Sequence, residues 1–331
     1  MSLTPHFPEP IALAQTPTPL ELLERVSDKL GVAVYIKRDD LTGMALSGNK
    51  VRKLEYLFAE AVAEGANHVL TCGAIQSNHC RATAVAAARL RMTSTVVLHG
   101  KPESTPDGNF LIDTLVGAEV VPITLQEYRD RNAIMQREAD RLRGEGKRPY
   151  IIPEGGSNAL GSLGYVKAMQ EIEHQEAAIG VSFDFIISAT GSSGTHVGLA
   201  AGAKCLDHSG DVIGINVCGS KTWFERRADG ILAEMESRYI PGLSMIGTDC
   251  HFLDGQQGEG YGLYTDDDLR GIQELAKCEG VLLDPVYTFK AWKGLLQLIE
   301  TGDIPQGGSV LFLHSGGLFG LFPARERLQS L

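Results

Sequence analysis

One loop and the helix that follows it organise the fold: Ser47-Gly48-Asn49-Lys50-Val51-Arg52-Lys53. Apolar residues recur from there at spacings of three and four, which predicts one buried helix face: Val51, Leu54, Leu57, Phe58, Ala61 and Val62. Lys50 is therefore presented from a turn at the start of a helix. Such a lysine can be a surface charge, a phosphate ligand, or an amine that condenses with a carbonyl group.

The composition is typical of a soluble α/β protein, with 43% hydrophobic and 21% charged residues. At 331 residues, the chain is long enough for two domains. The net charge of −11, from 41 acidic against 30 basic residues, opposes binding to nucleic acids and anionic membranes. We therefore expect a small-molecule partner, and neither a nucleic-acid nor a membrane partner.

The chain lacks the sequence signals of export and membrane insertion. Its start, Met1-Ser2-Leu3-Thr4-Pro5, has no basic segment before an apolar run, and no stretch approaches ~18 apolar residues. The cysteines stand at positions 72, 80, 205, 218, 250 and 278, without a C-x-x-C pair or a cluster at zinc spacing. We expect reduced thiols in the cytoplasm, no signal peptide and no metal site.

Strand and helix patterns alternate along most of the chain, which favours parallel α/β domains. Before position 160 we expect strands at 32–36, 68–72, 95–98, 119–123 and 150–152, and helices at 20–30, 80–90, 109–117 and 126–143. After it we expect strands at 183–187, 212–217 and 310–313, and helices at 162–176 and 197–205. Thr265, followed by three aspartates, predicts a further helix start. Residues 220–262 carry no clear pattern. The predicted fold is two open parallel-sheet α/β domains.

A glycine-rich loop, Thr190-Gly191-Ser192-Ser193-Gly194-Thr195, joins a buried strand to a helix. Successive backbone N–H groups at a helix start suit a phosphate, although a tight turn that needs glycine for its conformation alone has the same pattern. The loop is not a G-x-G-x-x-G fingerprint. Residues 43–51 are not a Walker A loop, because Asn49 precedes Lys50 and Val51 replaces the hydroxyl that binds Mg²⁺. A nucleoside triphosphatase is therefore disfavoured.

Three further segments combine a turn with polar side chains. Gln76-Ser77-Asn78-His79 suits a helix N-cap, the simpler interpretation, or a set of donors for a carboxylate. Asp284-Pro285-Val286-Tyr287-Thr288-Phe289-Lys290 is strand-like and turns into a helix, and Tyr287 there can be ordinary core packing. His314-Ser315-Gly316-Gly317 ends a buried strand, where a parallel sheet places its ligand crevice, although Gly-Gly can mark only a turn.

These ambiguous features fit one cofactor when they are taken together. Pyridoxal 5′-phosphate (PLP) needs a lysine for its aldehyde, a cradle for its phosphate and a tuned partner for its ring nitrogen. Its amino-acid substrates need a carboxylate clamp. The segments around Lys50, Ser77, Gly191 and Ser315 together supply these groups.

The chain resembles the 1-aminocyclopropane-1-carboxylate (ACC) deaminase/D-cysteine desulfhydrase family of fold-type II PLP enzymes, which are relatives of the tryptophan synthase β chain. The motifs that carry the resemblance span nearly the whole chain, at 16–20, 35–42, 48–55, 73–79, 283–288 and 314–317. The resemblance implies a large PLP-binding domain formed by residues 1–52 and 163–331, and a small mobile α/β domain formed by residues 53–162. It also implies a homodimer.

The resemblance implies a set of cofactor-binding residues. Lys50 would form the Schiff base with PLP and later move the Cα proton. Lys53 and the loop 190–195 would hold the phosphate, and Asn78 would form a hydrogen bond with the ring hydroxyl. For the substrate, Ser77 with the backbone donors of Asn78 and His79 would hold the carboxylate. The substrate face would be lined by Tyr261 and Tyr287.

Thr288 and Ser315 are implied to face the ring nitrogen, and they distinguish the branches of the family. In the deaminase branch these positions hold glutamate and leucine. A carboxylate stabilises a protonated ring, a strong electron sink suited to opening a cyclopropane. A hydroxyl leaves the nitrogen largely neutral, which suffices for β-elimination with a good leaving group. The pair therefore favours the desulfhydrase branch. Phe289 stands where desulfhydrases usually have glycine, which leaves the shape of the pocket open.

The resulting hypothesis is a PLP-dependent carbon–sulfur lyase that acts on a small β-substituted amino acid. D-cysteine, the first candidate, would give pyruvate, sulfide and ammonia. A cysteate sulfo-lyase uses closely related chemistry, and ACC deaminase is less favoured because of Thr288. A different class of function, a non-catalytic protein that binds PLP or an amino acid, is disfavoured by the intact Lys50, Ser77 and Tyr287. A phosphate-sugar enzyme that uses the glycine loop without PLP is a further alternative.

Overall fold

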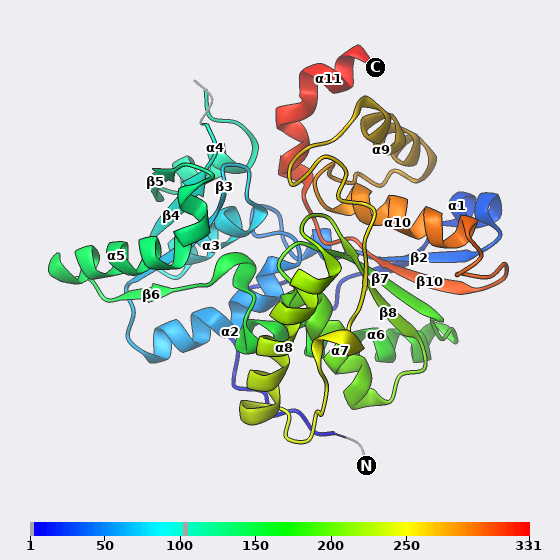
Figure 1. Cartoon of the computed structure of the whole chain (residues 1–331), viewed down its shortest axis with the longest axis horizontal. Coiled ribbons are helices and arrows are strands. Elements are labelled where there is room, and N and C mark those ends of the chain that lie inside the picture. The colour runs from blue at the N-terminus through cyan, green and yellow to red at the C-terminus, as the bar shows by residue number, and fades with distance from the viewer. Residues whose placement is uncertain (1–2, 102–104) are drawn as a thin grey trace.

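Two open sheets organise the chain, in a computed structural model that describes residues 3–101 and 105–331. Met1 and Ser2, on which the expectation of no signal peptide partly rests, lie outside the described residues. The strand order is β1-β2-β10-β7-β8-β9 in the six-stranded sheet and β5-β4-β3-β6 in the four-stranded sheet (Figure 1). Only β1 and β2 pair antiparallel among the described strands; the other neighbours are parallel. The predicted class of two parallel-sheet α/β units is confirmed.

The elements of the described chain have the following bounds. The strands are β1 (Leu20–Leu22), β2 (Ala33–Lys37), β3 (His68–Ala74), β4 (Thr93–His99), β5 (Glu119–Ile123), β6 (Pro149–Ile151), β7 (Phe185–Thr190), β8 (Asp211–Asn216), β9 (His251–Leu253) and β10 (Ser309–Leu313). The α-helices are α1 (Glu24–Leu30), α2 (Lys50–Ala63), α3 (Asn78–Arg89), α4 (Gly108–Leu115), α5 (Arg131–Gly144), α6 (Ala159–Ile179), α7 (Gly194–Leu206), α8 (Lys221–Arg238), α9 (Asp266–Glu279), α10 (Thr288–Glu300) and α11 (Arg325–Ser330). The 3₁₀ turns are η1 (Asp39–Leu41), η2 (Glu127–Asp130), η3 (Glu154–Gly156), η4 (Gly247–Asp249) and η5 (Leu318–Ala324).

Most predicted elements are present, two segments differ from the prediction, and one segment without a prediction contains regular structure. The helix expected at 20–30 is divided into the edge strand β1 and α1, because Leu20–Leu22 pairs with β2. The strand-like character expected at 284–287 is wrong: this segment is a turn, in which Pro285 has no N–H for a sheet and Asp284 caps the helix that follows. Residues 220–262, which carry no clear pattern, contain α8 and β9.

The six-stranded sheet combines both ends of the described chain. Strand β10 lies parallel to β2, with Leu311 opposite Tyr35, so the segment after β10 reaches the loop before α2. The backbone N–H of Asn49 donates to the carbonyl of Ser315 at 3.0 Å. The four-stranded sheet uses strands between residues 68 and 151 and lies beside the larger sheet (Figure 1). The domain boundaries at 52/53 and 162/163 stay a prediction.

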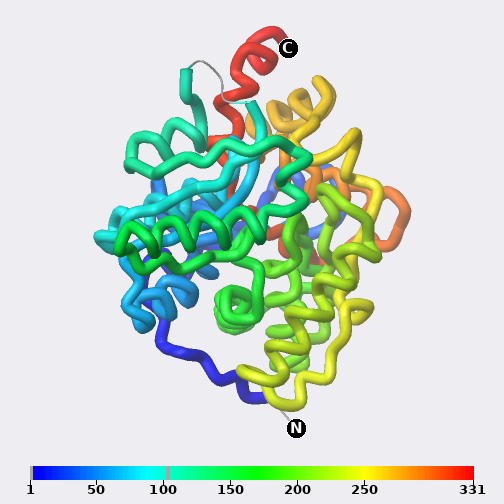
Figure 2. The backbone as a smooth tube through the Cα atoms, turned by 60° about the vertical axis from the view of Figure 1, so that its left-hand side comes forward, coloured from blue at the N-terminus to red at the C-terminus, as the bar shows by residue number. Residues whose placement is uncertain are grey.

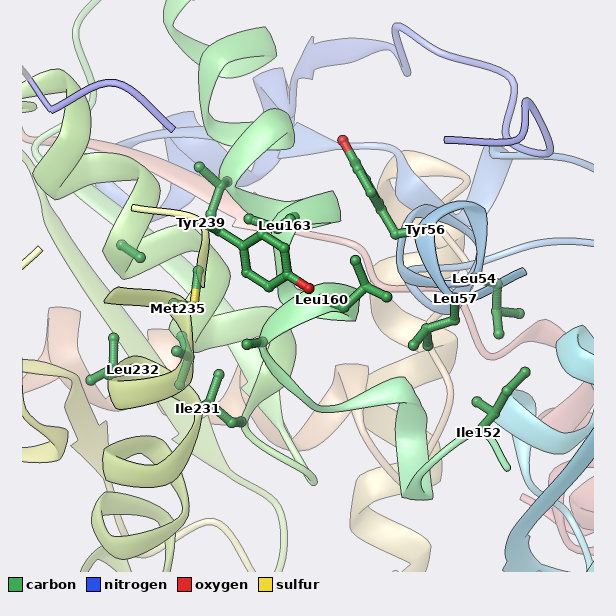
Figure 3. Close-up of a cluster of buried hydrophobic side chains, with 14 of the residues drawn as sticks. Leu54, Tyr56, Leu57, Ile152, Leu160, Leu163, Ile231, Leu232, Met235 and Tyr239 are labelled. Atoms are coloured by element: carbon green, nitrogen blue, oxygen red, sulfur yellow. The ribbon is translucent and has the colours of Figure 1, made fainter. Parts of the chain in front are cut away.

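A shared apolar core joins α2, α6 and α8 behind the site (Figure 3). Leu54 and Leu57 of α2, Leu163 of α6 and Met235 of α8 are almost fully buried in it. The predicted apolar face of α2 is buried except at Val62, which is 47% exposed because it lies near the end of the helix. This packing holds α2, which begins at Lys50, against α6.

The N-terminal segment runs along the outside of this core as an extended chain (Figure 2). The N–H of His6 donates to the carbonyl of Tyr239 at 2.7 Å, and the N–H of Leu13 donates to the Glu55 carboxylate at 2.9 Å. The segment therefore ties the end of α8 to α2. Within residues 3–101 and 105–331, no helix is both long and apolar enough to cross a membrane.

Candidate active site

The carboxyl ends of β3, β7 and β10 meet around one pocket between the two sheets. In a parallel sheet, this edge collects the loops that bind ligands. The structure brings most of the predicted site residues into the lining of this pocket: Lys50, Ser77, Asn78, His79, Thr190, Gly191, Ser192, Ser193, Thr195, Tyr261, Tyr287 and Ser315. It does not bring Lys53, Gly194 or Thr288 to the lining.

Lys50 is the first residue of α2, and its position depends on the loop before it. Gly48 has a φ of +92°, and a Cβ there would lie 2.8 Å from the carbonyl oxygen of Ser315, so a side chain does not fit. The Asn49 side chain donates to the Thr195 hydroxyl at 2.9 Å, which joins this loop to α7. Burial lowers the pKa of Lys50 to about 8, although the Glu154 charge raises it and the Arg227 charge lowers it further. The amine can therefore lose its proton near neutral pH.

Ser77, Asn78 and His79 occupy the turn between β3 and α3. Ser77 is the N-cap of α3 and accepts a hydrogen bond from the N–H of Cys80 at 3.2 Å. The helix N-cap, which was the simpler interpretation of this segment of the sequence, is therefore present. Its side chain also lines the pocket, together with the Asn78 side chain, whose buried oxygen has no protein partner. The helix start therefore presents hydroxyl and amide groups to a ligand.

The His79 ring is held as a neutral imidazole. Its Nε2 lies 2.7 Å from the Thr71 hydroxyl, which itself donates to the carbonyl of Ile152 at 2.9 Å. Nε2 must therefore be the donor, which leaves Nδ1 as a buried acceptor without a protein partner. Burial, with the charges of Lys50 and Lys53, holds the pKa of His79 well below its usual value.

The glycine-rich loop after β7 has the shape of an anion cradle. Ser193 has a φ of +68°, which turns the chain before α7. A Cβ at Gly191 would lie 2.9 Å from the Tyr287 ring, and a Cβ at Gly194 would lie 2.7 Å from the Ser157 hydroxyl. The hydroxyls of Thr190 and Ser193 are buried without protein partners. Free hydroxyls, close backbone and the start of α7 fit a phosphate group.

Lys53 supports this loop from behind. Its amine is fully buried and donates to the carbonyl of Gly155 at 3.1 Å and to the hydroxyl of Ser157 at 2.9 Å. The Ser157 hydroxyl in turn accepts a hydrogen bond from the N–H of Gly194 at 3.3 Å. Burial and the positive charges of Lys50 and Arg227 hold the pKa of Lys53 well below its usual value. Lys53 thus contacts the scaffold of the cradle and not the pocket itself.

Tyr261 and Tyr287 form one wall of the pocket. Their hydroxyls are 2.5 Å apart, and their rings meet edge to face with centroids 5.8 Å apart. Burial raises the pKa of both hydroxyls, so both are neutral near neutral pH. The pair brings two neutral hydroxyl groups to the lining, from segments 26 residues apart.

Thr288, which the resemblance implies to face the ring nitrogen, is not among the residues that line the pocket. Its hydroxyl donates to the Asp284 carboxylate at 2.8 Å and accepts from the N–H of Asp284 at 2.7 Å. The Asp284 carboxylate also caps the first turn of α10, so both hydrogen-bonding directions of this hydroxyl are used inside the protein. Of the implied pair, only Ser315 lines the pocket.

Phe289 also points away from the pocket. Its ring packs onto α9 beside Gly271, where a Cβ would lie 2.2 Å from the ring. Gly271 thus makes room for the larger residue within the core. Phe289 is not part of the lining, so its large side chain does not change the shape of the pocket directly.

Several lining residues were not predicted from the sequence. Glu154 lies in the loop after β6, Tyr128 and Arg131 lie around the start of α5, and His196 and Trp223 lie near the starts of α7 and α8. One signal in the sequence could have indicated Glu154: a charged residue next to two glycines in the segment 153–158, whose composition is typical of a flexible loop. In the part of the chain that the structure describes, no cluster of three or more His, Cys, Asp or Glu could hold a metal ion.

The arrangement fits PLP in three respects. An amine that readily loses its proton suits the aldehyde, and the glycine loop with its free hydroxyls suits the phosphate. The unpartnered Asn78 oxygen, in the same pocket, would accept a hydrogen bond from a ring hydroxyl.

Comparison with known proteins agrees with this fit. The model of the pyridoxal-phosphate dependent enzyme family matches residues 11–316. A putative 1-aminocyclopropane-1-carboxylate deaminase of Thermotoga maritima is 41% identical over 96% of this chain and 99% of its own length. A D-cysteine desulfhydrase of Salmonella choleraesuis is 41% identical over 96% of both chains. The crystal structure of an ACC deaminase homologue superposes with a TM-score of 0.88 at 36% identity, over 98% of this chain and 96% of that one.

Proposed function

This chain belongs to the pyridoxal-phosphate dependent enzymes, within the ACC deaminase/D-cysteine desulfhydrase group, and we propose that it eliminates the β-substituent of a small amino acid, with D-cysteine as the first candidate. The observation that carries the proposal is the Lys50 amine, with its lowered pKa, in one pocket with the Ser77–Asn78 turn. The name of the Salmonella relative supports the choice of D-cysteine.

In this proposal, Lys50 holds the cofactor and then takes the proton from the substrate Cα. PLP, when bound, withdraws the electron pair that this step releases. The hydroxyl of Ser77 and the start of α3 hold the substrate carboxylate, since the groups there are donors at a helix N-terminus. Thr190, Ser193 and the backbone of the loop hold the phosphate, and Lys53 keeps the loop in place.

The leaving group departs into the pocket, of which Tyr287 and Tyr261 form one wall. One hydroxyl donates to the other in this pair, and the O–H that remains free can donate to a thiolate as the bond between Cβ and sulfur breaks. D-cysteine and water then yield pyruvate, hydrogen sulfide and ammonia. Ser315 is the one member of the implied ring-nitrogen pair that lines the pocket, and its hydroxyl carries no charge. It therefore favours elimination over opening of a cyclopropane.

ACC deaminase is the second candidate, because the Thermotoga relative and the superposed crystal structure carry that name. The two functions differ in their products. Purified protein, loaded with PLP, should release pyruvate and sulfide from D-cysteine, and should release little 2-oxo acid from ACC. L-cysteine and cysteate belong in the same assay. Efficient turnover of ACC without release of sulfide from either cysteine enantiomer would contradict the proposal.

The Lys50→Ala variant tests the catalytic role against a non-catalytic binder. It should lose the visible absorbance of the Schiff base and the covalent attachment of PLP after borohydride reduction, together with turnover. Tyr287→Phe is the companion variant, and it should keep the covalent attachment. A Lys50→Ala protein that still eliminates at the wild-type rate would overturn the assignment.

We also propose a homodimer in the cytoplasm. The cysteines at all six positions are free thiols, which is typical of a reducing compartment. The dimer follows the family resemblance, and its test is the mass in solution, which should be twice the 35.7 kDa of one chain.

A further inference from the structure

A charged cluster lines the pocket on the side of the smaller sheet, and the roles above leave it unused. Its centre is the carboxylate of Glu154, which accepts from the Tyr128 hydroxyl at 2.6 Å and from Arg131 at 3.0 Å. The guanidinium of Arg227, from α8, lies 3.6 Å from the same carboxylate. Arg131, which lines the pocket, and Arg227, which lies behind the lining, thus share one negative partner.

The members of this cluster are held firmly, so their charges stay near the pocket. Arg131 lies over the Tyr128 ring, which in turn packs on the His99 ring with centroids 4.2 Å apart. Arg227 lies over the Trp223 ring and donates to the carbonyl of Ser192 in the glycine loop at 3.1 Å. The side chains of Arg131, Glu154 and Arg227 are 20–23% exposed, so solvent screens them only in part.

The balance of charge in this cluster depends on one residue. Burial lowers the pKa of His99 and raises that of Tyr128, so neither is charged near neutral pH. In the protein alone, the two positive groups Arg131 and Arg227 therefore face one negative group, Glu154. A phosphate bound at the glycine loop would add negative charge beside Arg227. With that phosphate bound, Glu154 is the partner that remains for Arg131, which also has a buried Nε without a protein partner. Without the Glu154 charge, Arg131 would be a ready site for an anion.

We propose that Glu154 is a specificity-determining residue: by neutralising Arg131 at the pocket, it selects amino acids with a neutral β-substituent and rejects those with a sulfonate or carboxylate there. The proposal rests on the proposed function and deepens it, because it disfavours cysteate as a substrate and favours a thiol. Glu154 lines the same pocket as Lys50, so its charge lies near the reacting end of a bound ligand.

Ligands that bind without turnover test the proposal. Alanine has only hydrogen atoms on Cβ, whereas aspartate has a carboxylate there. Neither amino acid carries a good leaving group. The dissociation constants of both enantiomers of each are measured with PLP-loaded protein, by the change in visible absorbance. Wild type should prefer alanine. In Glu154→Gln, which keeps the size of the side chain, the preference should fall by roughly tenfold, because one unit charge near the ligand is removed.

Arg131→Gln is the second variant and should act in the opposite direction. It leaves Glu154 without its closest cation, so aspartate should bind still more weakly relative to alanine. Glu138→Gln is the matched control, because Glu138 pairs with Arg141 on the outer surface of α5 and does not line the pocket. Its preference should equal that of wild type.

Two outcomes would overturn the proposal: wild type that binds aspartate as well as alanine, or a preference that is the same in wild type, Glu154→Gln and Arg131→Gln. A failure of the proposed β-elimination is separate from both. In that case alanine still changes the absorbance, while D-cysteine releases neither pyruvate nor sulfide.

Discussion

At the scale of single residues, the environment of Lys50 decides its chemistry. A surface lysine is protonated at neutral pH, and a protonated amine cannot attack an aldehyde. Burial lowers the pKa of Lys50 to about 8, which the sequence could not indicate. The sequence presented the lysine at a helix start, and the surrounding pocket makes it reactive.

The lowered pKa of Lys50 predicts how the rate of PLP uptake by the cofactor-free protein depends on pH. The neutral amine of Lys50 is the reacting form, so the rate of Schiff-base formation should rise with pH and reach half its maximum near pH 8. For a lysine with an ordinary pKa, the midpoint would lie near about 10.4. Stopped-flow absorbance across this pH range measures the midpoint, with free lysine as the reference amine. A profile like that of free lysine would contradict the lowered pKa.

Thr288 and Phe289 illustrate what a motif cannot tell at this scale. The motif is intact enough to identify the family, yet the Thr288 hydroxyl bonds to Asp284 and the Phe289 ring packs beside Gly271. The direction of each side chain depends on its neighbours within the fold. Ser315 and Glu154 line the pocket, so they can contact a substrate, whereas Thr288 and Phe289 cannot.

At the scale of elements, the close contact between α6 and α7 positions the glycine loop. A Cβ at Gly198 of α7 would lie 2.4 Å from the carbonyl oxygen of Ser162, and a Cβ at Gly202 would lie 2.6 Å from the Met169 side chain. The two glycines are one helical turn apart, so they form one smooth strip where the helices touch. The sequence indicates that α7 is rich in alanine and glycine, but it does not indicate that the two glycines of this helix pack against α6.

Gly198→Ala should therefore separate the two helices and lower the free energy of unfolding by about 1–3 kcal/mol. Gly230→Ala in α8 is the matched control, because a Cβ there meets no atom within 4 Å. It should be neutral or raise stability by up to about 1 kcal/mol, since alanine favours a helix. Urea unfolding measures both variants. Equal effects of the two substitutions would show that the helix contact is not tight.

At the scale of the whole molecule, a buried ion network ties distant segments together beneath the site. Arg52 donates to Asp39 and to Glu171, and the closest N–O distance of each pair is 2.9 Å. Asp39 also accepts from the hydroxyls of Thr18 and Tyr165. Burial alone would raise the pKa of Asp39, but the charge and hydrogen bonds of Arg52 outweigh it and keep the carboxylate ionised. The N-terminal segment, η1, α2 and α6 thus meet at one guanidinium.

Arg52→Met should lower the free energy of unfolding by about 3–5 kcal/mol, because it leaves the fully buried Asp39 carboxylate without its paired cation, whereas Lys37 still pairs with Glu171. Arg270→Met serves as the control, since Arg270 pairs with Asp267 on an exposed face and such pairs contribute little. Chemical denaturation measures both. An Arg52→Met protein as stable as Arg270→Met would mean that this network does not hold the segments together.

The sequence by itself determined the fold class, most elements, the family and the cofactor. Alternating strand and helix patterns are local, and so are caps such as Thr265, whose capping box is present in the structure. The motifs around Lys50, Ser77 and Ser315 are also short segments, which is why their resemblance to a family could be recognised without a structure.

Only the tertiary structure decided which side chains meet. Glu154, Arg131 and Arg227 come from three separate segments, and no spacing in the sequence links them. The same holds for the position of Lys53 behind the glycine loop and for the packing of the Phe289 ring beside Gly271. The physical reason is that burial, charge and the direction of a side chain are set by contacts between segments that are distant in the chain, whereas patterns in the sequence report on neighbours.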